Sequence, residues 1–301
     1  METRELLSSP SMLPLFARAG AAMIPGASNL PILGGFVGGG DDVPELALVL
    51  KDVAIDPDRL AAYSRVCGFD LRDVLPATYP HVLAFPLQLS LMTDSSFPFP
   101  AIGLVHIYNR ITQHRPIRTS EKVQITVSAT PLEGHPRGQQ FSLLSEVRIA
   151  DELVWEEIST NLRRGGAGAR EDARMPGAEL SSAADLPATA TWTLPGDLGR
   201  RYGSVSGDLN PIHMHPLTAR LFGFKSAIAH GMWTNARCLA ALGARLPEAF
   251  TIEVAFKKPI LLRGEVEFCE VAGPGEAFTV HFGVRDPRKG GSHLDGLAFA
   301  A

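Results

Sequence analysis

The chain has few cysteines and lacks the segments that mark a secreted or membrane protein. Only three cysteines occur among 301 residues, Cys67, Cys238 and Cys269, and they are far apart in apolar surroundings. An odd, scattered set argues against a disulfide framework and favours reduced thiols. No apolar run reaches the roughly 18–20 residues of a membrane span, and the first residues lack the basic and apolar regions of a secretory signal. We therefore expect a cytoplasmic protein with no membrane span.

The chain also lacks a block of basic residues. It contains 28 Lys and Arg against 32 Asp and Glu, which gives a formal net charge of −4. Proteins that bind nucleic acid usually carry a clustered basic surface, so we expect no nucleic-acid partner. Hydrophobic residues make up 45% of the chain, which is enough for two cores of ordinary domain size.

Composition divides the chain into four parts. Residues 1–40 end in a glycine-rich stretch that has no lysine in the register of a phosphate-binding loop, so we predict an N-terminal extension and a connector. Residues 165–190 are rich in Gly, Ala, Ser and Pro and predict a linker. The remaining parts, 41–164 and 191–301, each contain helix signals followed by strands of β-branched and aromatic residues.

These two parts can be aligned as copies of one another. Tyr63 and Tyr202 lie 139 residues apart, and at that offset Cys67-Gly68 falls on Ser206-Gly207. Each copy has a helix before this point and an apolar helix after it; the second apolar helix starts at Gly231 and is hydrophobic around most of its circumference. The sequence therefore predicts an internal duplication.

The segment 202–233 holds the residues with the clearest chemical potential. Asp208 and His213 are five positions apart, among the turn formers Gly207, Asn210 and Pro211. A separation of five does not stack two side chains on one helix face, but a bent loop could direct both ionisable groups to one point. The alternative is a surface turn in which Asp208 caps a helix and His213 has no role.

A longer pattern favours the first interpretation. Together these positions resemble the signature of the MaoC-like, R-specific enoyl-CoA hydratases: Tyr202, Ser206-Gly207-Asp208, Asn210-Pro211, His213, Pro216 and Ala219. The chain departs from the family pattern at His215, where the family usually has Asp or Asn. That position is expected to be the N-cap of a short helix from Pro216, so the departure concerns the cap.

The resemblance implies a fold and an activity. The fold is α+β, a double hot-dog in which each copy wraps an antiparallel sheet around a buried helix. The activity is the reversible hydration of trans-2-enoyl thioesters to (R)-3-hydroxyacyl thioesters in fatty-acid metabolism. The substrate would be carried by CoA or by an acyl carrier protein, and no cofactor is needed. A homodimer is an assembly that the sequence leaves open.

The resemblance also implies roles for individual residues. Asp208 and His213 would be the catalytic acid–base pair, and the backbone N–H of Gly231, at a helix start, would hold the thioester oxygen. Asn210 and Ser206 would support the loop.

The duplication suggests which residues surround the substrate. At the offset of 139, Phe69 and Val74 fall on Asp208 and His213, so the first copy lacks the acid–base pair and would shape the acyl-binding site. We expect four residues to contact substrate: His230, Met232, Phe69 and Val74. His81, near the equivalent of His230, has no Asp partner in register and is predicted to be structural.

Two other interpretations concern the same residues. His213 and His215 could bind a metal, but they would need carboxylate or thiol ligands and no cysteine is near in sequence, so we predict no metal. A hot-dog thioesterase, or a non-catalytic acyl-thioester-binding protein, would share the fold. Thioesterases usually lack the string from Ser206 to His213.

Overall fold

The computed structural model describes residues 2–21, 42–165, 169–170, 172–173 and 175–301. The predicted glycine-rich connector, at 34–40, lies outside these ranges. The chain divides into two compact units, each built from several segments. Unit 1 contains Met1–Ala54, His81–His106 and Lys122–Met175, and unit 2 contains Ile55–Pro80, Ile107–Glu121 and Pro176–Ala301.

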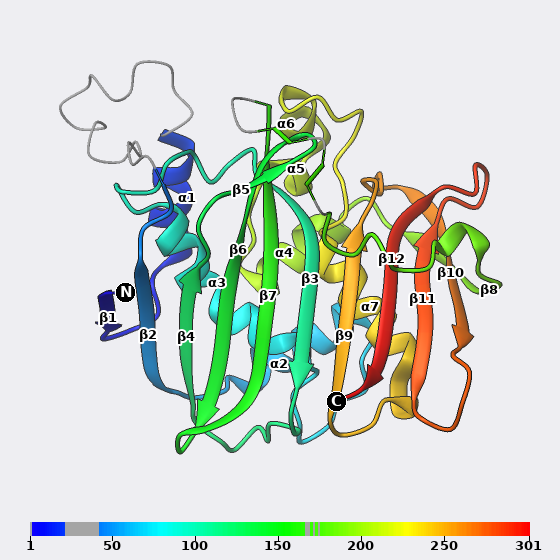
Figure 1. Ribbon diagram of the computed structural model, residues 1–301, viewed down its shortest axis with the longest axis horizontal. Coiled ribbons are helices and arrows are strands. Elements are labelled where there is room, and N and C mark those ends of the chain that lie inside the picture. The colour runs from blue at the N-terminus through cyan, green and yellow to red at the C-terminus, as the bar shows by residue number, and fades with distance from the viewer. Residues whose placement is uncertain (1, 22–41, 166–168, 171, 174) are drawn as a thin grey trace. The chain divides into compact units, whose positions relative to one another are not determined.

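The described part of unit 1 contains a run of paired strands and two helices. Its strands are ordered β1-β2-β4-β6-β7, with β5 paired to β6; β1 is parallel to β2 and the other pairs are antiparallel (Figure 1). The strands are β1 (Glu2–Leu6), β2 (Leu46–Val53), β4 (Val123–Ala129), β5 (Glu133–His135), β6 (Gly138–Ile149) and β7 (Glu152–Arg164). The helices are α1 (Met12–Ala21) and α3 (Tyr79–Met92). The first two residues of α3, Tyr79 and Pro80, belong to unit 2, and the rest of the helix belongs to unit 1.

Helix α3 forms the centre of unit 1. It is hydrophobic on nearly all sides, and Val82, Leu87 and Leu91 are fully buried. A helix of this kind is stable only when protein surrounds it. Its Gln88 donates to Ser145 of β6 at 2.9 Å and to Glu157 of β7 at 3.0 Å, which ties the helix to the face of the sheet.

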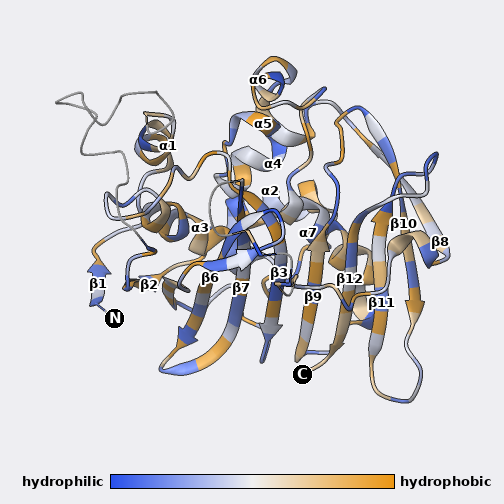
Figure 2. Cartoon of the chain, turned by 45° about the horizontal axis from the view of Figure 1, so that its top comes forward, coloured by the Kyte–Doolittle hydropathy of each residue, from blue (hydrophilic) through white to orange (hydrophobic). Residues whose placement is uncertain are grey.

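The strands of unit 2 follow the order β3-β9-β12-β11-β10-β8, with antiparallel neighbours throughout. The strands are β3 (Val105–Gln113), β8 (Ala188–Leu194), β9 (Phe250–Phe256), β10 (Gly264–Ala272), β11 (Thr279–Arg285) and β12 (Ser292–Ala300). Apolar and polar residues alternate along β8 and along Phe250 to Val254 of β9, as in half-buried strands, and Figure 2 shows both hydrophobic and hydrophilic bands on the strands.

The helices of unit 2 carry the loop around Asp208. They are α2 (Pro57–Cys67), α4 (Leu198–Ser206), α5 (Pro211–Met214), α6 (Pro216–Leu221) and α7 (Gly231–Leu242), with short 3-10 turns at Ala183–Asp185 and Gly243–Arg245. Helix α7 is the buried helix: Ala236, Cys238 and Leu239 are at most 1% exposed. Among the described residues, no helix combines the length and the apolar character that a membrane crossing needs.

Helices α2 and α4 end in the same way, which supports the predicted duplication. Gly68 and Gly207, 139 positions apart, both adopt the left-handed conformation, with φ of 82° and 86°. Their N–H groups bond to Ser64 O and Gly203 O, which are also 139 positions apart. Only glycine takes this conformation readily, so both helices stop at the residue that the sequence indicates.

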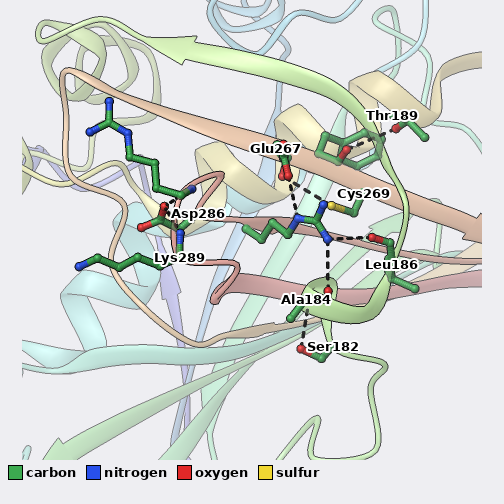
Figure 3. Close-up of polar contacts among 11 residues, drawn as sticks. Ser182, Ala184, Leu186, Thr189, Glu267, Cys269, Asp286 and Lys289 are labelled. Carbon is green, nitrogen blue, oxygen red and sulfur yellow. Dashed lines mark hydrogen bonds and ion pairs between the residues drawn. The ribbon is translucent and has the colours of Figure 1, made fainter.

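The second half of the predicted linker is ordered on unit 2. Buried Asp295 accepts from Ala183 N at 2.7 Å. Arg285 donates to Glu267 at 2.7 Å and to the carbonyl oxygens of Ala184 and Leu186 at 3.2 and 3.0 Å. Figure 3 draws these bonds as dashed lines to the labelled residues Glu267, Ala184 and Leu186. Strand β8 then begins at Ala188. The boundaries that we predict between the copies stay a prediction.

Candidate active site

The loop after α4 bends sharply because side chains replace helical hydrogen bonds. After Gly207, Asp208 N donates to Ser206 Oγ at 3.1 Å, and Asn210 N donates to Asp208 Oδ1 at 3.1 Å. Asn210 then caps α5, accepting from Ile212 N at 3.4 Å. The turn residues therefore hold Asp208 in place through its backbone N–H and its Oδ1, and its Oδ2 takes no part in these turn bonds.

His213 lies on α5 and is 8% exposed. Its Nδ1 lies 2.8 Å from the carbonyl oxygen of Ile228. A carbonyl accepts only, so Nδ1 carries the proton and Nε2 keeps a lone pair. Ile228 is held in turn, since it forms a bridge with Leu261. The ring is thereby fixed in one orientation with one nitrogen able to accept a proton.

His230 joins this pair. Its ring stacks on His213 with centroids 3.7 Å apart, and Tyr202 packs against it at 4.8 Å. Its Nε2 lies 3.0 Å from the backbone oxygen of Asp208 and 3.7 Å from Asp208 Oδ2, while its Nδ1 has no partner among the described residues. One side-chain atom from each of Asp208, His213 and His230 lies within 4.8 Å of the others.

Burial keeps both imidazoles neutral. Loss of solvent lowers the pKa of His213, an effect that the charge of Asp208 and the bond to Ile228 offset only in part. Burial and the neighbouring His213 lower the pKa of His230 to about 3. At neutral pH the cluster therefore contains one carboxyl group and two uncharged rings, and His213 Nε2 is available as a base.

Two glycines of α4 let the loop approach the helix. A Cβ at Gly199 would collide with the carbonyl oxygen of His213, and a Cβ at Gly203 would lie 2.9 Å from the carbonyl oxygen of Asp208. The backbone of both predicted catalytic residues therefore packs directly on α4. Sequence reasoning did not identify this role, although two glycines four positions apart inside a helix were a visible signal.

Gly231 is the first residue of α7, directly after His230. The first N–H groups of a helix have no partner inside it and carry the positive end of the helix dipole. A Cβ here would lie 2.9 Å from the ring of Phe256, so packing also requires glycine. A helix N-terminus thus follows His230 directly, and the role of Gly231 as an oxyanion donor stays a prediction.

Comparisons with known proteins agree on one family. The MaoC like domain model matches residues 175–275, which contain the whole cluster. The 3-hydroxyacyl-thioester dehydratase X of Mycobacterium tuberculosis is 35% identical over 269 residues, covering 89% of this chain and 92% of that protein. The chain belongs to the MaoC-like dehydratase family. The predicted family and the predicted enzyme class, a hydro-lyase, are both confirmed.

Solved structures confirm the α+β double hot-dog fold of this MaoC-like dehydratase. The crystal structure of HtdX of M. tuberculosis superimposes with a TM-score of 0.74 at 34% identity and covers 85% of this chain and 100% of its own. A MaoC-like dehydratase from Phytophthora capsici gives 0.71 at 18% identity, covering 86% and 95%. A further M. tuberculosis protein with a double hot-dog fold gives 0.55 at 12% identity, covering 87% and 96%. The last two show the fold alone.

The residues predicted to contact substrate lie at different distances from the cluster of this dehydratase. Met232 is buried in the first turn of α7. Phe69 stacks on Tyr63 at 6.3 Å, and Tyr63 lies 6.1 Å from Tyr202, so two rings separate Phe69 from His230. Val74 forms a bridge with Arg118. The substrate-binding roles stay predictions, as do those of the catalytic and supporting residues.

In unit 1, His81 has a partner that sequence register did not reveal. Its Nδ1 lies 2.7 Å from Glu157, a carboxylate that is 2% exposed on β7. Glu157 is 76 residues away in sequence, so the register between the two copies does not indicate it.

The metal interpretation does not fit the donor atoms. His215 is exposed, and its Nδ1 accepts from Leu217 N at 3.1 Å as the N-cap of α6, so histidine performs the capping role of the usual Asp or Asn. Asp208, His213 and His230 have a spacing that could surround a cation. However, His230 Nε2 donates its proton to the Asp208 carbonyl and so has no lone pair to offer there.

Proposed function

We propose that this protein hydrates trans-2-enoyl thioesters reversibly to (R)-3-hydroxyacyl thioesters. The convergence of Asp208, His213 and His230 carries the proposal, because a carboxyl group and a neutral imidazole within 4.8 Å of one another are the acid–base groups that this reaction needs. The relative in M. tuberculosis is named a 3-hydroxyacyl-thioester dehydratase, which agrees with this chemistry.

The reaction needs a base for water and a proton for C2. A water held by Asp208 and His213 gives one proton to one of them, and its oxygen forms a bond to C3 as the C2–C3 double bond opens. The electron pair moves to C2, which takes a proton from the pair. His213 suits the basic step because Nε2 has a lone pair and Nδ1 is fixed by Ile228. Dehydration follows the same path in reverse.

The charge that develops on the thioester oxygen also needs a partner. The Gly231 N–H, at the start of α7, supports it by a hydrogen bond and by the helix dipole. A donor that is fixed in advance is effective because it needs no reorientation during the reaction.

A direct assay tests the function. Purified protein is mixed with crotonyl-CoA and longer trans-2-enoyl thioesters, and the loss of ultraviolet absorbance of the conjugated thioester is followed. Chiral analysis of the product then tests the R configuration. Free thiol is measured in the same samples, since a thioesterase would release it and a hydratase would not. Thiol release without hydration would favour the alternative function, and neither would favour a binding protein.

Substrate length tests the roles of Phe69 and Val74. These apolar residues occupy the positions of the acid–base pair in the first copy, which favours acyl chains longer than crotonyl. We expect kcat/KM to rise with chain length, on CoA or on an acyl carrier protein. A steady fall from crotonyl-CoA would contradict the apolar-surface hypothesis.

Two expectations about the context of the enzyme have their own tests. Sedimentation velocity measures whether it forms a homodimer, and localisation of the tagged protein measures whether it is cytoplasmic.

A further inference from the structure

The loop that carries Asp208 starts at the carboxyl end of α4. The last carbonyl groups of a helix have no partner within it, and a cation placed there interacts favourably with the helix dipole. Helix α4 has no basic residue in its own last turn. Its end is therefore expected to depend on a donor from another element.

Arg59 supplies that donor. It lies in the first turn of α2, and its Nε donates to Val205 O at 2.8 Å while its Nη2 donates to Ser206 O at 3.2 Å. Its backbone is fixed by the N-cap Asp56, whose Oδ1 accepts from Asp58 N at 2.9 Å and Arg59 N at 3.2 Å. One planar guanidinium thus holds two successive carbonyl groups, a task that suits its rigid arrangement of donors.

The equivalent helix of the other copy is held differently. At the offset of 139, Val205 corresponds to Val66, whose carbonyl accepts from the neutral Trp233 indole at 3.0 Å. The position equivalent to Arg59 is Leu198. A charged donor therefore bonds to the helix end that leads to Asp208, and a neutral donor bonds to the helix end that leads to Phe69. The end of α2 has its cations nearby instead, with Arg65 in its last turn and the Arg237 guanidinium beside Gly68.

Arg59 connects to the acid–base pair through a short series of bonds. Ser206, whose carbonyl accepts from Arg59, also accepts from Asp208 N through its hydroxyl at 3.1 Å. We propose that Arg59 is a positioning residue for the dehydratase reaction: by holding the end of α4, it fixes where the carboxylate of Asp208 meets His213. The inference rests on the proposed function of that pair.

This role predicts a particular kinetic effect. Without the guanidinium, the two carbonyl groups bond to water and the loop from Ser206 to Asn210 gains freedom. The loop holds the acid–base residue, whereas Gly231 and Met232 belong to α7. Substrate binding should therefore be nearly preserved while the chemical step slows, because a misplacement of about 1 Å can cost on the order of 100-fold in rate.

The experiment compares Arg59→Ala, Arg59→Lys and the control Arg65→Ala in the full chain, by steady-state hydration and thermal unfolding. Arg65 is exposed on the same helix, so its replacement makes the same charge change away from the loop. We expect kcat of Arg59→Ala to fall roughly 10- to 100-fold, with KM within about twofold of wild type. Lysine keeps the positive charge but lacks the rigid, planar set of donors that holds both carbonyl groups, so the kcat of Arg59→Lys should be intermediate. Arg65→Ala should match wild type.

Two results would overturn the proposal: a wild-type kcat in Arg59→Ala, or a rise in KM that accounts for the whole loss of kcat/KM. If Arg59→Ala does not fold, Arg59→Lys decides, and a wild-type kcat in that variant overturns the proposal. The wild-type assay separates this from the function itself: active wild type with unaffected variants rejects only the role of Arg59, whereas inactive wild type rejects the proposed function.

Discussion

If Asp208 and His213 act as one unit, removing either should remove most of the catalysis. Asp208→Asn keeps an oxygen that can accept from Asn210 N, so the turn should survive while the carboxylate is lost. His213→Gln keeps an amide that can donate to Ile228 O but has no nitrogen lone pair to act as a base. Each change therefore tests chemistry with little disturbance of the loop.

The expected size follows from the role. Loss of an acid–base residue usually lowers kcat by about 10²- to 10⁴-fold, which is roughly 2.7–5.4 kcal/mol of transition-state stabilisation. The two side chains lie at one site within 4.8 Å, so they should share one water. The double variant should then be little worse than either single one, because residues that act together are not additive.

The assay is steady-state hydration and dehydration of one enoyl and 3-hydroxyacyl thioester pair, with thermal unfolding of each variant. Both directions should fall by the same factor, because the overall equilibrium is unchanged. His215→Asn is the control, since His215 is exposed in the same segment and asparagine can cap α6. If either catalytic variant retained about a tenth or more of wild-type kcat, the pair would not carry the chemistry, and His230 would be tested next.

Three further predictions follow from buried groups. The pKa of His230 is lowered to about 3, so as pH falls the imidazole is protonated in the unfolded chain before it is protonated in the folded chain. The stability that the neutral His230 contributes should therefore be lost between pH ~6.5 and ~3, up to about 5 kcal/mol. Urea unfolding across that pH range would measure the loss. His81→Leu leaves the buried carboxylate of Glu157 without its imidazole and should lower the free energy of unfolding by about 3–5 kcal/mol; adding Glu157→Gln should recover much of the loss, and no recovery would argue against the pair. Gly203→Ala puts a Cβ 2.9 Å from the Asp208 carbonyl and should lower kcat, whereas Gly20→Ala, which meets nothing within 4 Å, should leave it unchanged; equal kcat in both would exclude close packing as the reason for glycine.

The sequence predicted elements whose signals are local. Helix α2 ends at Gly68 because only glycine takes the left-handed conformation cheaply, and α7 is apolar around most of its circumference because it is largely buried. The convergence of Asp208 and His213 followed from turn formers between them. These features depend on neighbours in the chain, so a single sequence contains the information.

Contacts between distant segments could not be predicted in this way. Glu157 meets His81 across 76 residues, and Arg59 meets Ser206 across 147, with nothing in either segment to indicate the other. The stacking of His230 on His213 brings the N-cap of α7 against a residue of α5. Each depends on tertiary packing, which the periodicity of a single segment does not encode.

The equivalence of Tyr63 and Tyr202 has a consequence for how such a site can change. Their rings lie 6.1 Å apart, at matching positions of two copies within one chain. In a symmetric dimer of identical subunits, every substitution appears at both positions, so an arginine that helps one helix end must also be tolerated at the other. A single chain removes this constraint, and here one position holds Arg59 and its equivalent holds Leu198. Fusion of the copies thus allows matching positions to differ, which is the condition for the separate roles that we propose for the two copies.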